Sequence, residues 1–235
     1  MAPVKLQRAL RRGLTERRNP ERGKQQQTYM KSTMPYAGLA APELRQFVRE
    51  LCREYECEDA QAWLACILKL WREARVREER YAALEILSLA RYKKAWLAPE
   101  HMELHRKLIT TGAWWDFVDT IAINSVGALL RDHPTDIKPL IYAWAIDEDL
   151  WIRRTSILAQ LKFKGATDES LLFYAIEQSA DNKDFFAKKA IGWALREYSK
   201  TQHATVIDYV ESQREHLSAL SIREGLRVVK KQGLV

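Results

Sequence analysis

The sequence predicts an all-α fold, a right-handed superhelical solenoid of two-helix repeats preceded by an N-terminal amphipathic helix. Apolar residues recur at helical spacing in short segments from residue 42 to the C-terminus, and no segment alternates in the manner of a strand. Pro, Gly and Asp separate these segments by short connections, which place successive helices antiparallel. Because 47% of the 235 residues are hydrophobic, the chain has enough apolar material for one continuous repeat array.

The N-terminal helix is strongly basic. Leu6, Leu10 and Leu14 lie four residues apart on one face, and Met1–Lys24 contains eight basic and two acidic residues, so that it holds +6 of the formal net charge of +7. We therefore divide the chain into a basic arm, residues 1–24, and a single repeat domain, residues 25–235. A transit peptide has a similar pattern. The arginines that such an arm would present to phosphates are Arg8, Arg11 and Arg12.

The remaining helices follow from apolar spacing and from the breaks between segments. Each is expected to be short and to pack one apolar face against its neighbours. Their expected ranges are 42–55, 59–71, 78–92, 99–111, 114–130, 134–146, 149–163, 168–179, 183–200, 201–211 and 218–231.

A weak internal repeat favours a solenoid over a bundle. The segment DLWIRRTSI, which begins at Asp149, resembles DFFAKKAIG, which begins at Asp184, at an offset of 35 residues. This period is typical of two-helix repeats of the HEAT or tetratricopeptide kind. The same offset makes Asp119, Arg154 and Lys189 equivalent in three consecutive repeats, so we expect them to line one strip of the superhelix.

The segment AWWDFVD, residues 113–119, is the most distinctive in the chain. At 100° per residue, Trp115 shares a helix face with Asp119 and the small Ala122, so an indole and a carboxylate project together. The alternative is that Trp115 is packed and Asp119 bonds the terminus of a neighbouring helix.

Two further helices combine charged and apolar residues on one face. Arg154 shares the apolar row of its helix, so it either extends to solvent or points at a buried anion such as a phosphate. Lys189, Trp193 and Arg196 form one face at i, i+4 and i+7. Alternating cations and an indole suit a sugar-phosphate backbone.

Other kinds of site have little support in the sequence. Cys52, Cys57 and Cys66 form no CxxC pair, which favours reduced core cysteines and a reducing compartment. His101 and His105 lie four residues apart, but no third metal ligand is evident. There is no phosphate-binding glycine loop, dinucleotide motif or nucleophile elbow, and no apolar run long enough for a membrane helix. We therefore expect no metal, no cofactor and no membrane contact.

These segments resemble the AlkD family of bacterial DNA glycosylases, which are built from HEAT-like repeats. The resemblance covers nearly all of the chain from about Gln7 and is strongest at TYMKSTM from Thr28, WWDFVD from Trp114, LWIRR from Leu150, LKFK from Leu161 and KKAIGWALREY from Lys188. It implies hydrolysis of the glycosidic bond of N3- and N7-alkylated purines, such as 3-methyladenine and 7-methylguanine, in duplex DNA. The family is thought to act without moving the base into a deep pocket, unlike most glycosylases.

The resemblance also implies roles for individual residues. Asp119 would be the catalytic carboxylate, Trp115 and Trp193 the active-site indoles, and Arg154 a DNA contact. A purine alkylated at N3 or N7 is already cationic, so it leaves without a general acid, and the carboxylate stabilises the oxocarbenium-like sugar. Further DNA contacts are expected at Tyr29, Lys31, Lys162, Lys164, Lys189 and Arg196.

The expected partner is double-stranded DNA containing alkylated purines, bound by a monomer in the bacterial cytoplasm, associated with the nucleoid. Two alternatives stay open: a catalytically silent DNA-binding HEAT-repeat protein and a protein-binding HEAT scaffold. Trp115 and Asp119 argue against the first. Lys189, Trp193 and Arg196 argue against the second, since a scaffold would have apolar or acidic residues there.

Overall fold

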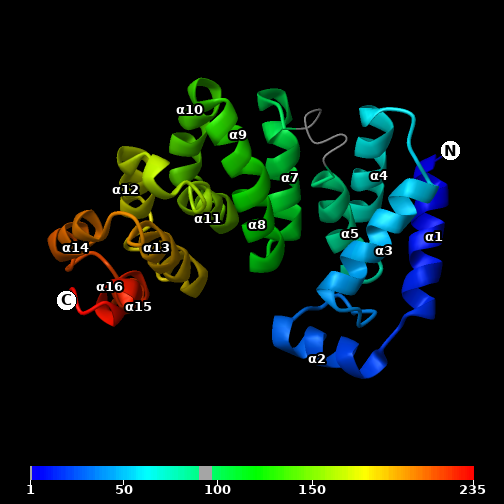
Figure 1. Ribbon diagram of the computed structural model, residues 1–235, viewed down its shortest axis with the longest axis horizontal. Coiled ribbons are helices and arrows are strands. Elements are labelled where there is room, and N and C mark those ends of the chain that lie inside the picture. The colour runs from blue at the N-terminus through cyan, green and yellow to red at the C-terminus, as the bar shows by residue number, and fades with distance from the viewer. Residues whose placement is uncertain (1, 90–96) are drawn as a thin grey trace. The chain divides into compact units, whose positions relative to one another are not determined.

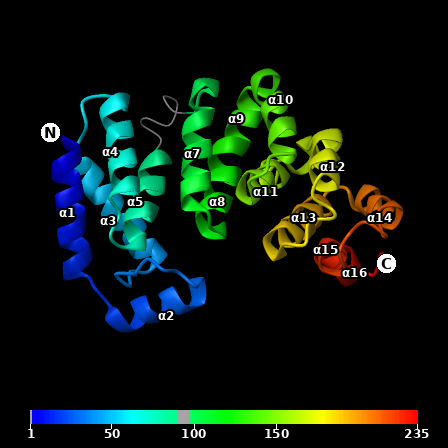
Figure 2. The ribbon, with the colours of Figure 1, turned by 180° about the vertical axis from the view of Figure 1, so that it is seen from behind.

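A computed structural model describes residues 2–89 and 97–235 of the chain (Figures 1 and 2). Every regular element within these ranges is a helix, and the repeat-like packing of the helices confirms the predicted all-α solenoid class. The chain divides into two compact units, Met1–Trp96 and Leu97–Val235. Among the described residues, no helix combines the length and the apolar character needed to cross a bilayer.

The helices described in the first unit are α1 (Ala2–Glu16), α2 (Pro20–Met30), α3 (Ala41–Glu54), α4 (Ala60–Arg72) and α5 (Arg77–Leu87). The expected helices 42–55, 59–71 and 78–92 correspond to α3, α4 and α5. Residues 90–92, at the end of the last expected helix, lie outside the described residues. Helix α2 was not predicted.

Helix α2 depends on its termini and not on an apolar pattern. The Asn19 side chain accepts a backbone N–H of the first turn, and Pro20 occupies the first helical position. Only Gly23 and Met30 are buried. Gly38, with φ of 95°, lies so close to the start of the helix that a Cβ would come 2.0 Å from the Asn19 carbonyl oxygen. A polar helix of this kind escapes a search for apolar periodicity.

Helix α1 packs on α3 and α4 through the apolar face that the sequence predicted. The leucines of this face are at most 3% exposed, namely Leu6, Leu10 and Leu14. The boundary at residue 24 between an arm and a repeat domain stays a prediction.

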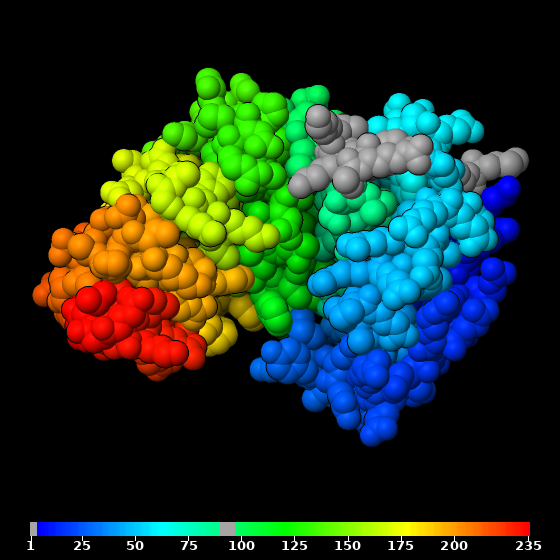
Figure 3. Space-filling view, in the orientation of Figure 1, coloured from blue at the N-terminus to red at the C-terminus, as the bar shows by residue number. Residues whose placement is uncertain are grey.

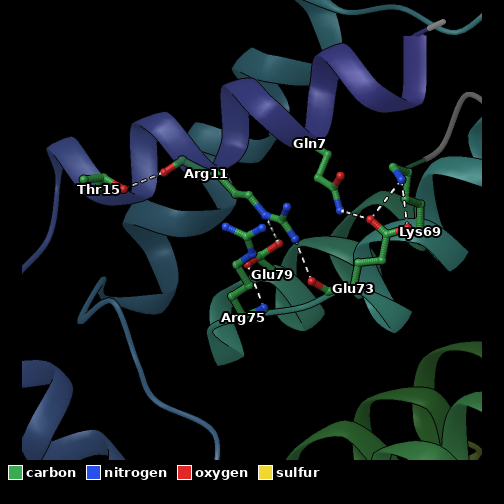
Figure 4. A network of polar contacts seen from close by, with 7 residues as sticks. All are labelled: Gln7, Arg11, Thr15, Lys69, Glu73, Arg75 and Glu79. Atoms are coloured by element: carbon green, nitrogen blue, oxygen red, sulfur yellow. Dashed lines mark hydrogen bonds and ion pairs between the residues drawn. The ribbon is translucent and has the colours of Figure 1, made fainter.

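One arginine of the arm takes part in the docking of α1. Arg11 donates from Nε to the Glu79 carboxylate at 2.9 Å and from Nη2 to the Glu73 carbonyl oxygen at 2.6 Å (Figure 4). The Glu79 side chain is only 1% exposed. Arg8 and Arg12, in contrast, are exposed. The phosphate contacts expected of the arm therefore rest on Arg8 and Arg12, because the Arg11 guanidinium is bound within the fold.

The helices described in the second unit follow the expected order. Three expected helices differ from the prediction: the one over 114–130 is interrupted by a π-helical segment, the one over 149–163 ends at Leu158, and the one over 218–231 is divided at Leu226. The elements are η1 (Pro99–His101), α7 (Met102–Gly112), α8 (Trp115–Ile121), η2 (Ala122–Val126), α9 (Gly127–Asp132), α10 (Pro134–Ala145), α11 (Leu150–Leu158), η3 (Lys164–Ala166), α12 (Glu169–Glu177), α13 (Phe185–Tyr198), α14 (His203–Ser212), α15 (Ala219–Gly225) and α16 (Arg227–Lys231).

Repeat-equivalent helices of the second unit stack on one another. Helices α8, α11, α13 and α15 are neighbours in that order (Figures 1 and 2). Asp149 and Asp184, 35 residues apart, each accept a backbone N–H from the first turn of the helix that follows. Asp147 and Asn182 in turn accept the backbone N–H groups of these two aspartates. The offset of 35 residues is thus present in the local geometry of successive helices.

We expect Arg11→Gln to lower the free energy of unfolding by about 2–3 kcal/mol, because the buried Glu79 carboxylate would lose its cation. The expected loss is smaller than for a fully buried ion pair because the Arg11 side chain is 24% exposed. The matched control is Arg12→Gln, which removes an exposed contact of 3.9 Å to Glu16 and should cost less than about 0.5 kcal/mol. Urea denaturation measures both. Equal urea midpoints for Arg11→Gln and Arg12→Gln would show that the Arg11 contact does not stabilise the unit.

Candidate functional site

A buried ion pair joins two of the predicted site residues. Arg154 donates from Nε to Asp119 Oδ1 at 2.7 Å and from Nη2 to Asp119 Oδ2 at 2.8 Å. The two side chains are 5% and 12% exposed, respectively. Arg154 Nη1 also donates to the carbonyl oxygen of Phe186 at the start of α13. The sequence left open what Arg154 points at, and within the structure it is the Asp119 carboxylate.

The helices around this pair hold it in place. Phe117 and Val118, which precede Asp119 on α8, are fully buried. Directly after α8 the chain forms the π-helical turn η2, a feature often found near functional sites. Gly127 follows, and a Cβ there would come 2.4 Å from the Ala159 carbonyl oxygen. The small residue therefore permits close approach between the start of α9 and the end of α11.

The environment of Asp119 has opposing effects on its pKa. Burial raises the pKa because the ionised carboxylate loses its water, and the nearby charge of Asp116 acts in the same direction. The hydrogen bonds and charge of Arg154 oppose this rise. Each carboxylate oxygen has two lone pairs. The bonds from Arg154 therefore leave acceptor capacity for a cation or a water molecule.

An aromatic cluster adjoins the ion pair through Phe186. The ring centroids of Trp114, Trp151 and Phe186 are 5.1–6.0 Å apart. Phe185, beside them, is 58% exposed and meets Phe186 edge-on. The helical spacing of these aromatic residues did not assign them to the site. A signal existed, because Trp151 and Phe186 are equivalent at the offset of 35 residues.

The two predicted indoles are both half-buried but differ in their relation to Asp119. Trp115 lies one turn before Asp119 on α8, which places the two side chains on one face. Trp193 lies seven residues after Phe186, about 10 Å along α13. It packs against the core of the second unit. None of the described contacts joins Trp193 to Asp119.

The two predicted cations of α13 share one carboxylate. Glu224 of α15 pairs with Lys189 Nζ at 3.2 Å and with Arg196 Nη1 at 2.8 Å. The Lys189 hydrogen bond and the positive charges of Lys189, Arg196 and Arg227 hold the pKa of Glu224 below its usual range. Glu224 lies 35 residues after Lys189, as Arg154 lies 35 residues after Asp119. The cationic face predicted on α13 is therefore partly neutralised.

The other predicted DNA contacts lie outside this cluster. Lys162 donates to Asn124 Oδ1 of η2 at 2.8 Å. Lys164 is exposed and has φ of 55°. In the first unit, Tyr29 of α2 is 77% exposed, and Lys31 caps the end of the same helix. The DNA contacts assigned to these four residues stay predictions.

The cysteines form no candidate catalytic group. All three are reduced and buried, with 3.4 Å between Cys57 Sγ and Cys66 Sγ. Burial raises the pKa of both thiols, which makes them poor nucleophiles. Within residues 2–89 and 97–235, no cluster of three or more His, Cys, Asp or Glu side chains is arranged to hold a metal ion.

Known proteins resemble the chain over most of its length. The profile of a family described as DNA alkylation repair enzyme matches residues 10–229. A solved structure described as a predicted DNA alkylation repair enzyme from Enterococcus faecalis is 30% identical, with a TM-score of 0.81, over 91% of this chain and 97% of that chain. No curated protein matches. The chain therefore belongs to the AlkD-like family of DNA alkylation repair enzymes.

Proposed function

We propose that the protein hydrolyses the N-glycosidic bond of cationic N3- and N7-alkylpurines, such as 3-methyladenine and 7-methylguanine, in duplex DNA. The family gives the coarser role, repair of alkylation damage in DNA. The observation that carries the proposal is the buried pair of Asp119 and Arg154, with Trp115 one turn away. The protein acts as a monomer without a cofactor, on DNA of the bacterial nucleoid.

The proposed reaction requires little of the protein except correctly placed charges. When the glycosidic bond breaks, its electron pair goes to the cationic base, which leaves neutral, and the sugar becomes oxocarbenium-like. Asp119 stabilises that positive charge and orients the water, which adds to the sugar and releases one proton to solvent. The faces of Trp115 and Trp193 attract the cationic base before it leaves.

Arg154 has two roles in this proposal. A guanidinium has five N–H donors, of which three are used by Asp119 and the Phe186 carbonyl. The first role is to position Asp119 and to favour its ionised form. The second role, contact with a DNA phosphate, would use the two remaining donors.

We expect Asp119→Asn to reduce excision of 7-methylguanine by about 10²–10³-fold, because the amide keeps the shape of the carboxylate and removes its charge. Asp132→Asn, on the exposed end of α9, is the matched control and should excise normally. Single-turnover rates on alkylated duplex measure the effect. Affinity for undamaged duplex and thermal unfolding are measured alongside to exclude loss of fold. A normal rate for Asp119→Asn would contradict the catalytic role.

The positioning role of Arg154 predicts a change in pH dependence. Excision requires ionised Asp119, so the rate should fall as the pH decreases through a pKa that burial has raised. Arg154→Gln removes the opposing charge, and the acidic limb of the profile should then move upward by about 1–3 pH units. Arg154→Lys should restore part of this shift. If Arg154→Gln bound DNA more weakly but kept the acidic limb at the wild-type pH, the positioning role would be contradicted and only the phosphate contact would be supported.

The charge of the leaving base predicts substrate choice. Cationic 7-methylguanine should be excised, whereas its neutral ring-opened form, hypoxanthine and uracil should be poor substrates, because their departure needs a proton. Single-turnover rates in one duplex context, with binding measured separately, make the comparison. Comparable rates on cationic and neutral lesions would reveal a general acid, for which Asp116 is the first candidate.

A further inference from the structure

A basic hollow lies at the C-terminal end of the second unit. It has a volume of about 520 Å³ and is lined by Arg196, Lys200, Arg227, Val228, Lys231 and Gln232. Arg196 belongs to the end of α13 and Lys200 follows that helix, whereas the other lining residues belong to α16 and its C-cap, Gln232. Figure 3 shows α15 and α16, in red, at the surface beside the orange residues that precede them. The lining contains four cations and no carboxylate.

The concentration of positive charge here contrasts with the rest of the unit. Residues 97–235 contain 18 basic and 19 acidic residues, so the unit as a whole has a formal charge of −1. The last 13 residues, 223–235, contain four basic residues and one acidic residue. The hollow is therefore a local positive surface on a slightly negative unit, and its presence cannot follow from the overall composition.

Neighbouring carboxylates neutralise only part of this charge. Arg196 pairs with Glu224, and Lys200 pairs with Glu197 at 2.6 Å. Arg227 and Lys231 are exposed, and among the described residues neither side chain forms an ion pair or a hydrogen bond, although the charge of Arg227 contributes to the lowered pKa of Glu224. Helix C-termini attract single cations. That attraction does not explain why cations from two helices converge on one hollow, where they repel one another unless an anion is bound.

We infer that this hollow binds backbone phosphates of duplex DNA away from the lesion. Arg196 lines the hollow and also lies on the face of α13 predicted to meet DNA, with Lys189 and Trp193, so the hollow adjoins that face. Guanidinium groups bind phosphate oxygens through paired N–H donors, and lysines add point charges. The contacts are independent of base sequence. The identity of the polyanion rests on the proposed function.

The test is the salt dependence of binding to undamaged duplex by the full-length protein. Arg227→Gln combined with Lys231→Gln should lower the slope of log K against log salt concentration by up to about 2, because two phosphate contacts are lost. The matched control, Arg131→Gln combined with Arg214→Gln, removes the same charge from two exposed residues outside the hollow and should keep the wild-type slope. Thermal unfolding of both double variants checks that they fold.

The outcomes separate this inference from the proposed function. Equal slopes for the two double variants would overturn the inference, even where the wild-type protein excises 7-methylguanine. A lower slope in the Arg227→Gln and Lys231→Gln variant, but not in the control, supports the inference. If the wild-type protein then shows no excision, only the proposed function is overturned. A third outcome is that the slopes are equal but inorganic phosphate stabilises the wild-type protein and not the Arg227→Gln and Lys231→Gln variant. The hollow would then be a site for small anions, and this result would also overturn the inference.

Discussion

The pair formed by Asp119 and Arg154 is the contact on which both the fold and the proposed chemistry depend. Moving two charges out of water is costly, and their mutual bonds offset this cost only with good geometry. Arg154 belongs to α11, binds the carboxylate on α8 and donates to the Phe186 carbonyl on α13. One side chain thus connects three stacked helices. Because the same bonds favour the ionised carboxylate, loss of either partner affects stability and charge together.

The repeat explains how such a contact arises. In a solenoid, each repeat touches only its neighbours, so positions separated by one period are stacked against each other. A side chain can therefore meet its own equivalent in the next repeat, and the two form an ion pair where their charges are opposite. Contacts of this kind, each spanning 35 residues, join Asp119 to Arg154, Trp151 to Phe186 and Lys189 to Glu224.

The helices were predictable from sequence because apolar spacing is a local property, and the buried face of α13 followed from it directly. Helix α2 was not, since the Asn19 cap and the contact with Gly38 define its start and little of its surface is apolar. The register placed Asp119 and Arg154 on one strip, but whether a buried arginine meets a carboxylate or a phosphate depends on the distance between helices. Periodicity alone contains no such distance.

Pairing Asp119 with Arg154 also resolves an electrostatic conflict in the proposed reaction. A free carboxylate beside a DNA strand would repel the phosphates around it. A bidentate pair has no net charge, so its field falls off quickly with distance and is weak at the backbone. At contact distance, however, the carboxylate oxygens still present negative potential to a cation, and burial keeps that attraction from being screened by salt. In the proposed reaction, the pair would therefore attract a cationic purine without repelling the backbone.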